Sequence, residues 1–194
     1  QPKPFKHLFV SQFNIIDNLK RLVDREINHV KKGKKGKIVI KLNNLQERVM
    51  IEKLYEASQA GVQVEMIVRS VCCLVPGIPG VSDNITVRRI VDRFLEHSRM
   101  FLFHNNGEEE VFMGSADWMK RNLRSRIEVI FPVYNQDLKR QIIELLDVQF
   151  ADNVKAVMIG QNNDNIPLQT SEEEPKVQAQ LASYELVKEW EGIK

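Results

Sequence analysis

Residues 37–68 read KIVIKLNNLQERVMIEKLYEASQAGVQVEMIV. Residues 37–42 form a short run that is rich in β-branched side chains and bounded by Gly36 and Asn43, which is typical of a buried strand. A helix is predicted next, with Asn44 and Glu47 placed as in a capping box and Gly61 as the stop signal. The alternating residues 62–68 then form a second strand. Such a strand–helix–strand unit predicts parallel pairing with a right-handed crossover, and so an α/β fold.

Further elements flank this unit on both sides. Residues 14–30 carry apolar side chains at helical spacing, with Ser11 as a possible cap, and residues 138–150 repeat the helical pattern. Strands are predicted for residues 85–91 and 127–134. Residues 99–103 and 110–113 flank Asn105-Asn106-Gly107, and Asn-Gly favours a tight hairpin turn between them.

The composition is that of a soluble globular domain. The chain has 194 residues, of which 43% are hydrophobic and 28% charged, and its formal net charge is +2. No segment approaches the roughly 18 apolar residues of a transmembrane helix, and the net charge alone is too small to indicate a polyanion partner. Cys72 and Cys73 are adjacent, which fits neither a disulfide nor a zinc site and favours a reduced, cytoplasmic protein.

The sequence divides into a long folded part and a polar tail. We expect residues 1–160 to form one domain, because composition shifts after Gly160 to the polar stretch QNNDNIPLQTSEEEP. We expect residues 161–194 to form a polar linker and a C-terminal helix. The chain begins at Gln1 without a methionine, so we expect it to be part of a longer protein.

Candidate phosphate-binding residues follow two predicted strands. Arg69 comes directly after the strand over residues 62–68, where ligands bind in open α/β sheets. An arginine fork can donate two parallel hydrogen bonds to a phosphate. His97 and Arg99 open another strand, and the alternation of a strand places both on one face.

The second of these clusters resembles half of the phospholipase D signature, a His-x-Lys followed by Gly-Gly/Ser-x-Asn. His97 and the Gly114-Ser115 turn match it. Arg99 stands in place of the lysine, Asp117 in place of the asparagine, and His104 where that signature has an aspartate. A half-motif with these departures is a weak indication of function.

Longer stretches carry a more specific resemblance. KIVIKLNNL, MIEKLYEASQAGVQVEMIVRSVCCLVPGIPG, VSDNITVRRIVDRFLEHSRMFLF and GSADWMKRNLRSRIEVIFPV resemble the C-terminal region of the bacterial polyphosphate kinases that use a phosphohistidine intermediate. The resemblance runs from about residue 9 to about residue 159. It implies a phospholipase D-like fold, a mixed β-sheet flanked by helices, and reversible transfer of the terminal phosphate of ATP to inorganic polyphosphate.

The resemblance also assigns roles to particular residues. It implies that Arg69 binds phosphate and that His97 is the second, non-nucleophilic histidine of the catalytic site. The histidine that becomes phosphorylated has no match here, since His7 and His29 lie in a different context. The magnesium-binding residues and the base-contacting tyrosine of the family also lie upstream, so we expect no metal ligands in this chain and half an active site.

A basic track for polyphosphate is predicted beside this half-site, formed by Arg99, Lys120, Arg121 and Arg124. The expected partners are ATP or ADP, polyphosphate, upstream domains of the same chain, and further copies of the full-length protein. No nucleic acid is expected to bind.

Two other functions remain open on sequence grounds. A phospholipase D-type phosphodiesterase would share the fold and the His-x-Arg motif, and is disfavoured by the missing lysine and asparagine. A non-catalytic polyanion-binding module would keep its parent's activity when Arg69 or His97 is replaced.

Overall fold

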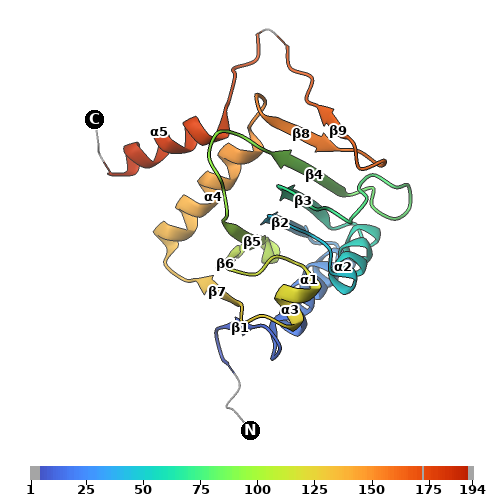
Figure 1. The fold of residues 1–194 in the computed structure, drawn as a ribbon. Helices are drawn as coiled ribbons and strands as arrows, with labels where there is room; N and C mark the ends of the chain where they lie inside the picture. Colours follow the sequence, from blue (N-terminus) through green and yellow to red (C-terminus); the bar gives the residue numbers. More distant parts are fainter. Residues whose placement is uncertain (1–4, 172, 192–194) are drawn as a thin grey trace.

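A computed structural model describes residues 5–171 and 173–191. Within these residues the chain forms a nine-stranded mixed sheet in the order β1-β7-β6-β5-β2-β3-β4-β8-β9, with helices on both faces (Figure 1). The prediction of an α/β fold is confirmed. None of the described helices is both long and apolar enough to cross a membrane.

The middle of the sheet is parallel, as the sequence predicts. Strand β2 (Lys37–Leu42) leads through helix α2 (Arg48–Gln59) to β3 (Gln63–Val68), and the two strands pair in parallel. Strand β4 (Ile85–Ile90) continues the parallel arrangement on the far side of β3. The carboxyl ends of these strands therefore lie at one end of the sheet.

Antiparallel strands extend the sheet from the other side of β2. Strand β5 (Arg99–Phe103) pairs with β2, β6 (Glu110–Gly114) with β5, and β7 (Val129–Val133) with β6. The predicted hairpin is confirmed, with residues 104–109 connecting its two strands. A short 3₁₀ turn, η1 (Asn105–Gly107), lies within this connection, where Asn105 and Asn106 have positive φ of 45° and 56°, a conformation that asparagine tolerates better than most residues.

Alternation along the strands buries both faces of the sheet. One face carries Ile38 and Ile40 into the main core beneath α1 (Ile15–Lys31) and α2. The other face carries Val39 into a second apolar cluster with Ile142 and Leu146 of α4 (Gln136–Phe150). A short helix, α3 (Lys120–Arg124), follows β6.

Short strands close the two sides of the sheet. Strand β1 (Phe9–Val10) pairs with β7, and β8 (Ala156–Ile159) pairs with β4. Strand β9 (Asn165–Pro167) pairs with β8, so part of the stretch predicted as a linker belongs to the sheet. The predicted C-terminal helix forms as α5 (Ala179–Glu191) and packs against α4.

Candidate active site

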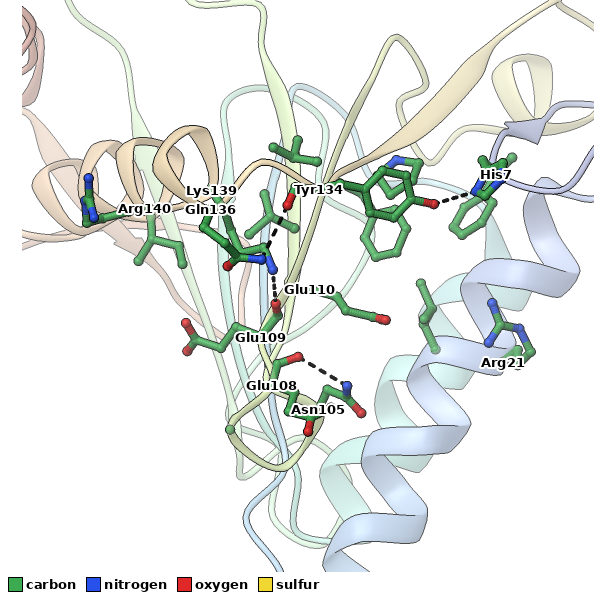
Figure 2. Close-up of a pocket in the computed structure, with 18 of the residues that line it drawn as sticks. His7, Arg21, Asn105, Glu108, Glu109, Glu110, Tyr134, Gln136, Lys139 and Arg140 are labelled. Carbon is green, nitrogen blue, oxygen red and sulfur yellow. Dashed lines mark hydrogen bonds between the residues drawn. The ribbon is translucent and has the colours of Figure 1, made fainter.

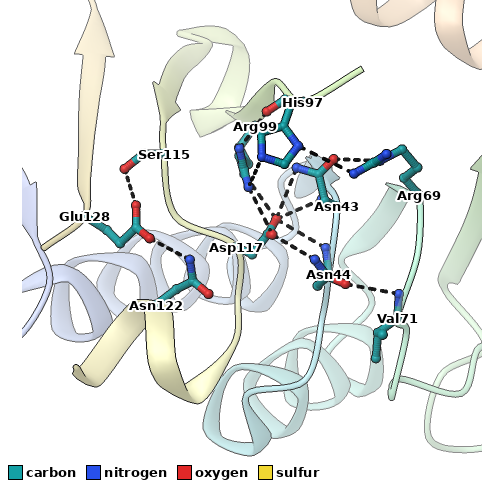
Figure 3. A network of polar contacts seen from close by, with 10 residues as sticks. All are labelled: Asn43, Asn44, Arg69, Val71, His97, Arg99, Ser115, Asp117, Asn122 and Glu128. Carbon is teal, nitrogen blue, oxygen red and sulfur yellow. Dashed lines mark hydrogen bonds and ion pairs between the residues drawn. The ribbon is translucent and has the colours of Figure 1, made fainter. Parts of the chain in front are cut away.

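Arg69 and His97 meet at the end of the sheet where β2 and β3 terminate. Arg69 follows β3, and His97 lies two residues before β5, which runs antiparallel to β2. The Nη2 atom of Arg69 lies 3.5 Å from Nδ1 of His97, and Nη2 of Arg99 lies 3.3 Å from its Nε2 (Figure 3). The exposed imidazole therefore lies between two guanidinium groups. The two residues singled out from the sequence converge, although His97 precedes the strand it was expected to open.

Asp117 organises the groups beneath this pair. Its carboxylate accepts hydrogen bonds from Arg99 at 3.2 and 3.1 Å, and from the main-chain N–H groups of Asn43 at 2.9 Å and Asn44 at 3.2 Å. Asn43 in turn accepts a 2.9 Å hydrogen bond from Nε of Arg69. The two residues that follow β2 thus orient both groups. The Asn43 side chain holds the Arg69 guanidinium, and the main-chain N–H groups of Asn43 and Asn44 hold the Asp117 carboxylate.

The charge on Asp117 is stabilised by these contacts. Burial alone would raise the pKa of the Asp117 carboxyl, but the hydrogen bonds from Arg99, Asn44 and Asn43 outweigh burial and lower it. The carboxylate therefore neutralises Arg99, whose own side chain is buried. Two of the three departures from the phospholipase D signature, the arginine for lysine and the aspartate for asparagine, are in direct contact.

The predicted capping role of Asn44 is wrong. Helix α2 starts at Arg48, with Glu47 as the preceding residue. The Asn44 side chain instead donates a 2.9 Å hydrogen bond to Asp117. A polar residue between a strand and a helix can cap the helix or contribute to a site, and Asn44 does the second.

A cavity of about 370 Å³ opens beside His97. It is lined by polar and charged side chains: Asn44, His97, Arg99, Ser115, Asp117, Arg121, Asn122, Arg126 and Glu128. Glu128 binds the hydroxyl group of Ser115 and accepts a 2.6 Å hydrogen bond from Asn122, so both of its oxygens are engaged (Figure 3).

Only part of the predicted basic track lines the cavity beside His97. Arg99 and Arg121 line the cavity, whereas Arg124 turns away and pairs with Glu47 at 2.7 Å. Lys120 is exposed and does not belong to the lining. Arg126, which the sequence analysis did not select, does line the cavity, because the chain turns back toward β7 after α3.

His7 and His29, which the sequence places outside the context of the phosphorylated histidine, lie elsewhere. His7 contacts the hydroxyl group of Tyr134 at 2.6 Å on the wall of a separate cavity of about 850 Å³ (Figure 2). His29 contacts Asn105 at 3.4 Å, beyond the end of β5 opposite to His97. Neither histidine reaches the Arg69–His97 site.

The carboxylates around His97 do not fit a metal site. Both oxygens of Asp117 and of Glu128 already accept hydrogen bonds from side-chain donors. Across the described ranges, no group of three or more histidine, cysteine, aspartate or glutamate side chains is arranged to hold an ion.

Comparison with known proteins identifies the family. The model of the family described as polyphosphate kinase C-terminal domain 2 matches residues 8–180. The chain belongs to the polyphosphate kinase family. It is 46% identical over 188 residues to the polyphosphate kinase of Vibrio vulnificus strain YJ016, covering 97% of this chain and 27% of that protein. The chain thus spans about a quarter of the length of such curated polyphosphate kinases.

Solved structures agree with this assignment. The crystal structure of polyphosphate kinase from Porphyromonas gingivalis superposes with a TM-score of 0.95 at 46% identity, over 100% of this chain and 30% of that one. The phospholipase D family member Nuc from Salmonella typhimurium superposes with a TM-score of 0.51 at 12% identity, over 83% of this chain and 97% of that one. The predicted phospholipase D-like fold is confirmed, and the roles of Arg69 and His97 remain predictions.

Proposed function

We propose that the chain supplies one half of the active site of a full-length polyphosphate kinase, which reversibly transfers the terminal phosphate of ATP to inorganic polyphosphate. The nucleophilic histidine belongs to a preceding part of that enzyme. The observation that carries the proposal is the meeting of Arg69 and His97, 3.5 Å apart, in a chain of this family. Phosphoryl transfer depends on alignment and charge neutralisation, which such a pair provides.

Arg69 and His97 have complementary tasks in this proposal. The Arg69 guanidinium, oriented by Asn43, donates hydrogen bonds to the non-bridging oxygens of the phosphate. The His97 imidazole is exposed, and a ring nitrogen of histidine can donate a hydrogen bond to a bound phosphate. It donates a hydrogen bond to the transferred group and acts as the acid for the departing oxygen.

The polyphosphate chain passes along the cavity wall on the α3 side. Arg121 and Arg126 are exposed there, and they provide the cationic surface for successive phosphates. Arg99 stabilises the site through Asp117 instead of binding the polyanion. Arg124, paired with Glu47, plays no part in this path.

In this proposal the ligands of magnesium lie outside this chain. The family resemblance implies Mg²⁺, but the carboxylates here are engaged with other donors, so its ligands belong to the preceding part of the enzyme. Bound Mg²⁺ neutralises charge on the nucleotide phosphates. This chain contributes the arginine and the histidine that face the same group.

Replacing the two residues in the full-length enzyme tests the proposal. Arg69→Ala and His97→Ala should each lower kcat at least about 100-fold, the cost of removing one donor to a developing anion. Matched controls are Arg48→Ala, an exposed arginine on α2, and His29→Ala. The controls should retain activity, and circular dichroism should show all four variants folded.

Three outcomes would count against the proposal. Activity of Arg69→Ala and His97→Ala within threefold of the wild type would show that the pair is not catalytic. The chain alone should acquire no acid-labile label from ATP carrying a labelled γ-phosphate, and labelling would place the nucleophile here. Hydrolysis of a phosphodiester by the full-length protein, without ATP-dependent chain synthesis, would favour the phosphodiesterase reading.

A further inference from the structure

The segment that carries His97 has no regular secondary structure. Residues 91–98 cross from β4 to β5, past the ends of β3 and β2 (Figure 1). Phe94 and Leu95 are 63% and 75% exposed. Over the described ranges, the main chain of this segment makes no hydrogen bond to another main-chain group. Side-chain contacts must therefore fix where His97 lies.

Helix α5 provides the principal contact. The side-chain carbonyl of Gln180 accepts a 2.9 Å hydrogen bond from the Phe94 N–H, and its amide donates to the Phe94 carbonyl at 2.7 Å. The same amide donates to Glu96 at 3.1 Å. Gln178 adds a 2.7 Å hydrogen bond to Asp92. One glutamine thus pairs with both main-chain polar groups of a residue three positions before His97.

Helix α5 is itself held firmly. The fully buried Asp152 accepts a 2.7 Å hydrogen bond from the N–H of Ala179 in the first turn. Farther along the helix, Nε1 of Trp190 donates to Glu144 of α4 at 3.0 Å. Gln180 therefore lies on a helix that is hydrogen-bonded to the rest of the domain near both of its ends.

Glu96, which accepts a hydrogen bond from Gln180, also contacts the centre of the sheet. Lys41 of β2 is buried, forms an ion pair with Glu96 and donates to Gln149 of α4 at 2.6 Å. Glu96 thus binds Lys41 through one oxygen and Gln180 through the other. The residue next to His97 is tied to the centre of the sheet and to α5 at once.

We infer that Gln180 is a positioning residue for His97, and that α5 holds the imidazole against Arg69. This inference rests on the proposed function, since it assigns Gln180 an effect on catalysis only through His97. Loss of the two main-chain hydrogen bonds lets residues 91–97 sample positions in which His97 is out of reach. The fraction of enzyme molecules with His97 in its catalytic position falls, whereas the contacts that other groups make with the nucleotide persist.

The test replaces Gln180 in the full-length enzyme. Gln180→Leu should lower kcat about tenfold, with KM for ATP changed less than about twofold, as for a shift in the competent population. Hydrogen exchange in residues 91–97 should accelerate, while the thermal midpoint stays near that of the wild type. Gln59→Leu is the matched control, because Gln59 also bonds a loop carbonyl, that of Gly80, away from the site.

A double variant separates positioning from a general structural effect. In a His97→Ala background, Gln180→Leu should cause no further loss of kcat, because its effect is transmitted through the imidazole. An equal loss in both backgrounds, or a Gln180→Leu enzyme within twofold of the wild type, would overturn the inference. A His97→Ala enzyme of near-normal activity would instead overturn the proposed function, so the two failures are distinguishable.

Discussion

The Arg99–Asp117 pair can be tested by replacing each partner and then both. The pair is buried, with side-chain exposures of 10% and 5%, and its closest approach is 3.1 Å. Asp117→Asn keeps the shape but removes the charge, and it turns an amide toward the guanidinium. Arg99→Met keeps the length but leaves the carboxylate buried without its cation.

Each single variant should cost about 3 kcal/mol, the lower end of the range for a buried pair that loses one partner. For a domain of this size, such a loss lowers Tm by roughly 6–12 °C. The double variant buries no uncompensated charge, so it should cost less than the sum of the two, with a coupling free energy of about 2 kcal/mol.

Urea denaturation of the wild type and the three variants measures this coupling. If the two costs add to within about 0.5 kcal/mol, the pair is not a unit and the reasoning is wrong. The pH provides a second check. Since folding lowers the pKa of Asp117, its contribution is fully present above the ordinary carboxyl value of about 3.9 and is lost as the pH falls below it. The difference between wild type and Asp117→Asn should therefore shrink at acidic pH.

Three further expectations concern other parts of the molecule. Arg121→Gln combined with Arg126→Gln should weaken polyphosphate binding and flatten its salt dependence, measured by titration at low and high salt, whereas Arg124→Gln should change neither. Burial lowers the pKa of Lys41, so stability should rise with pH from that lowered value to about 10.4, and Lys41→Met should abolish the rise in alkaline urea titrations. Trp118 is fully buried, and Trp118→Ala should lower the free energy of unfolding by about 3–5 kcal/mol in the same assay.

The elements that sequence reasoning predicted well are those with a strong local pattern. Residues 37–68 combine β-branched strands, a glycine stop and helical spacing, so the parallel unit β2-α2-β3 follows from them. Strands β8 and β9 were not predicted because they are only four and three residues long, too short for a clear pattern, and they extend the sheet from β4. Pairing across the sheet overrides what the composition of residues 165–167 suggests.

The residues of the candidate site differ in the same way: some have a local sequence signal, and others depend on contacts with distant parts of the chain. Arg69 was found because a strand end in an α/β sheet is a general ligand position, and His97 because of its motif. Asp117 was noted only as a departure from the phospholipase D signature, and Asn43 was not noted as a site residue, since their roles depend on a contact between residues 74 positions apart. Gln180 depends on a still longer connection, from the C-terminal helix to residue 94, 86 positions away.

The two sides of the sheet also limit how other polypeptides can associate with it. Strand β1 contributes two residues and β9 three, the last of them Pro167, which has no N–H to donate. Within residues 5–171 and 173–191, neither of these two short strands offers the long row of free main-chain groups that an incoming strand would need for augmentation. A polypeptide that associated with the sheet at either of these strands would rely mainly on side chains and loops, so single substitutions there should suffice to weaken the association.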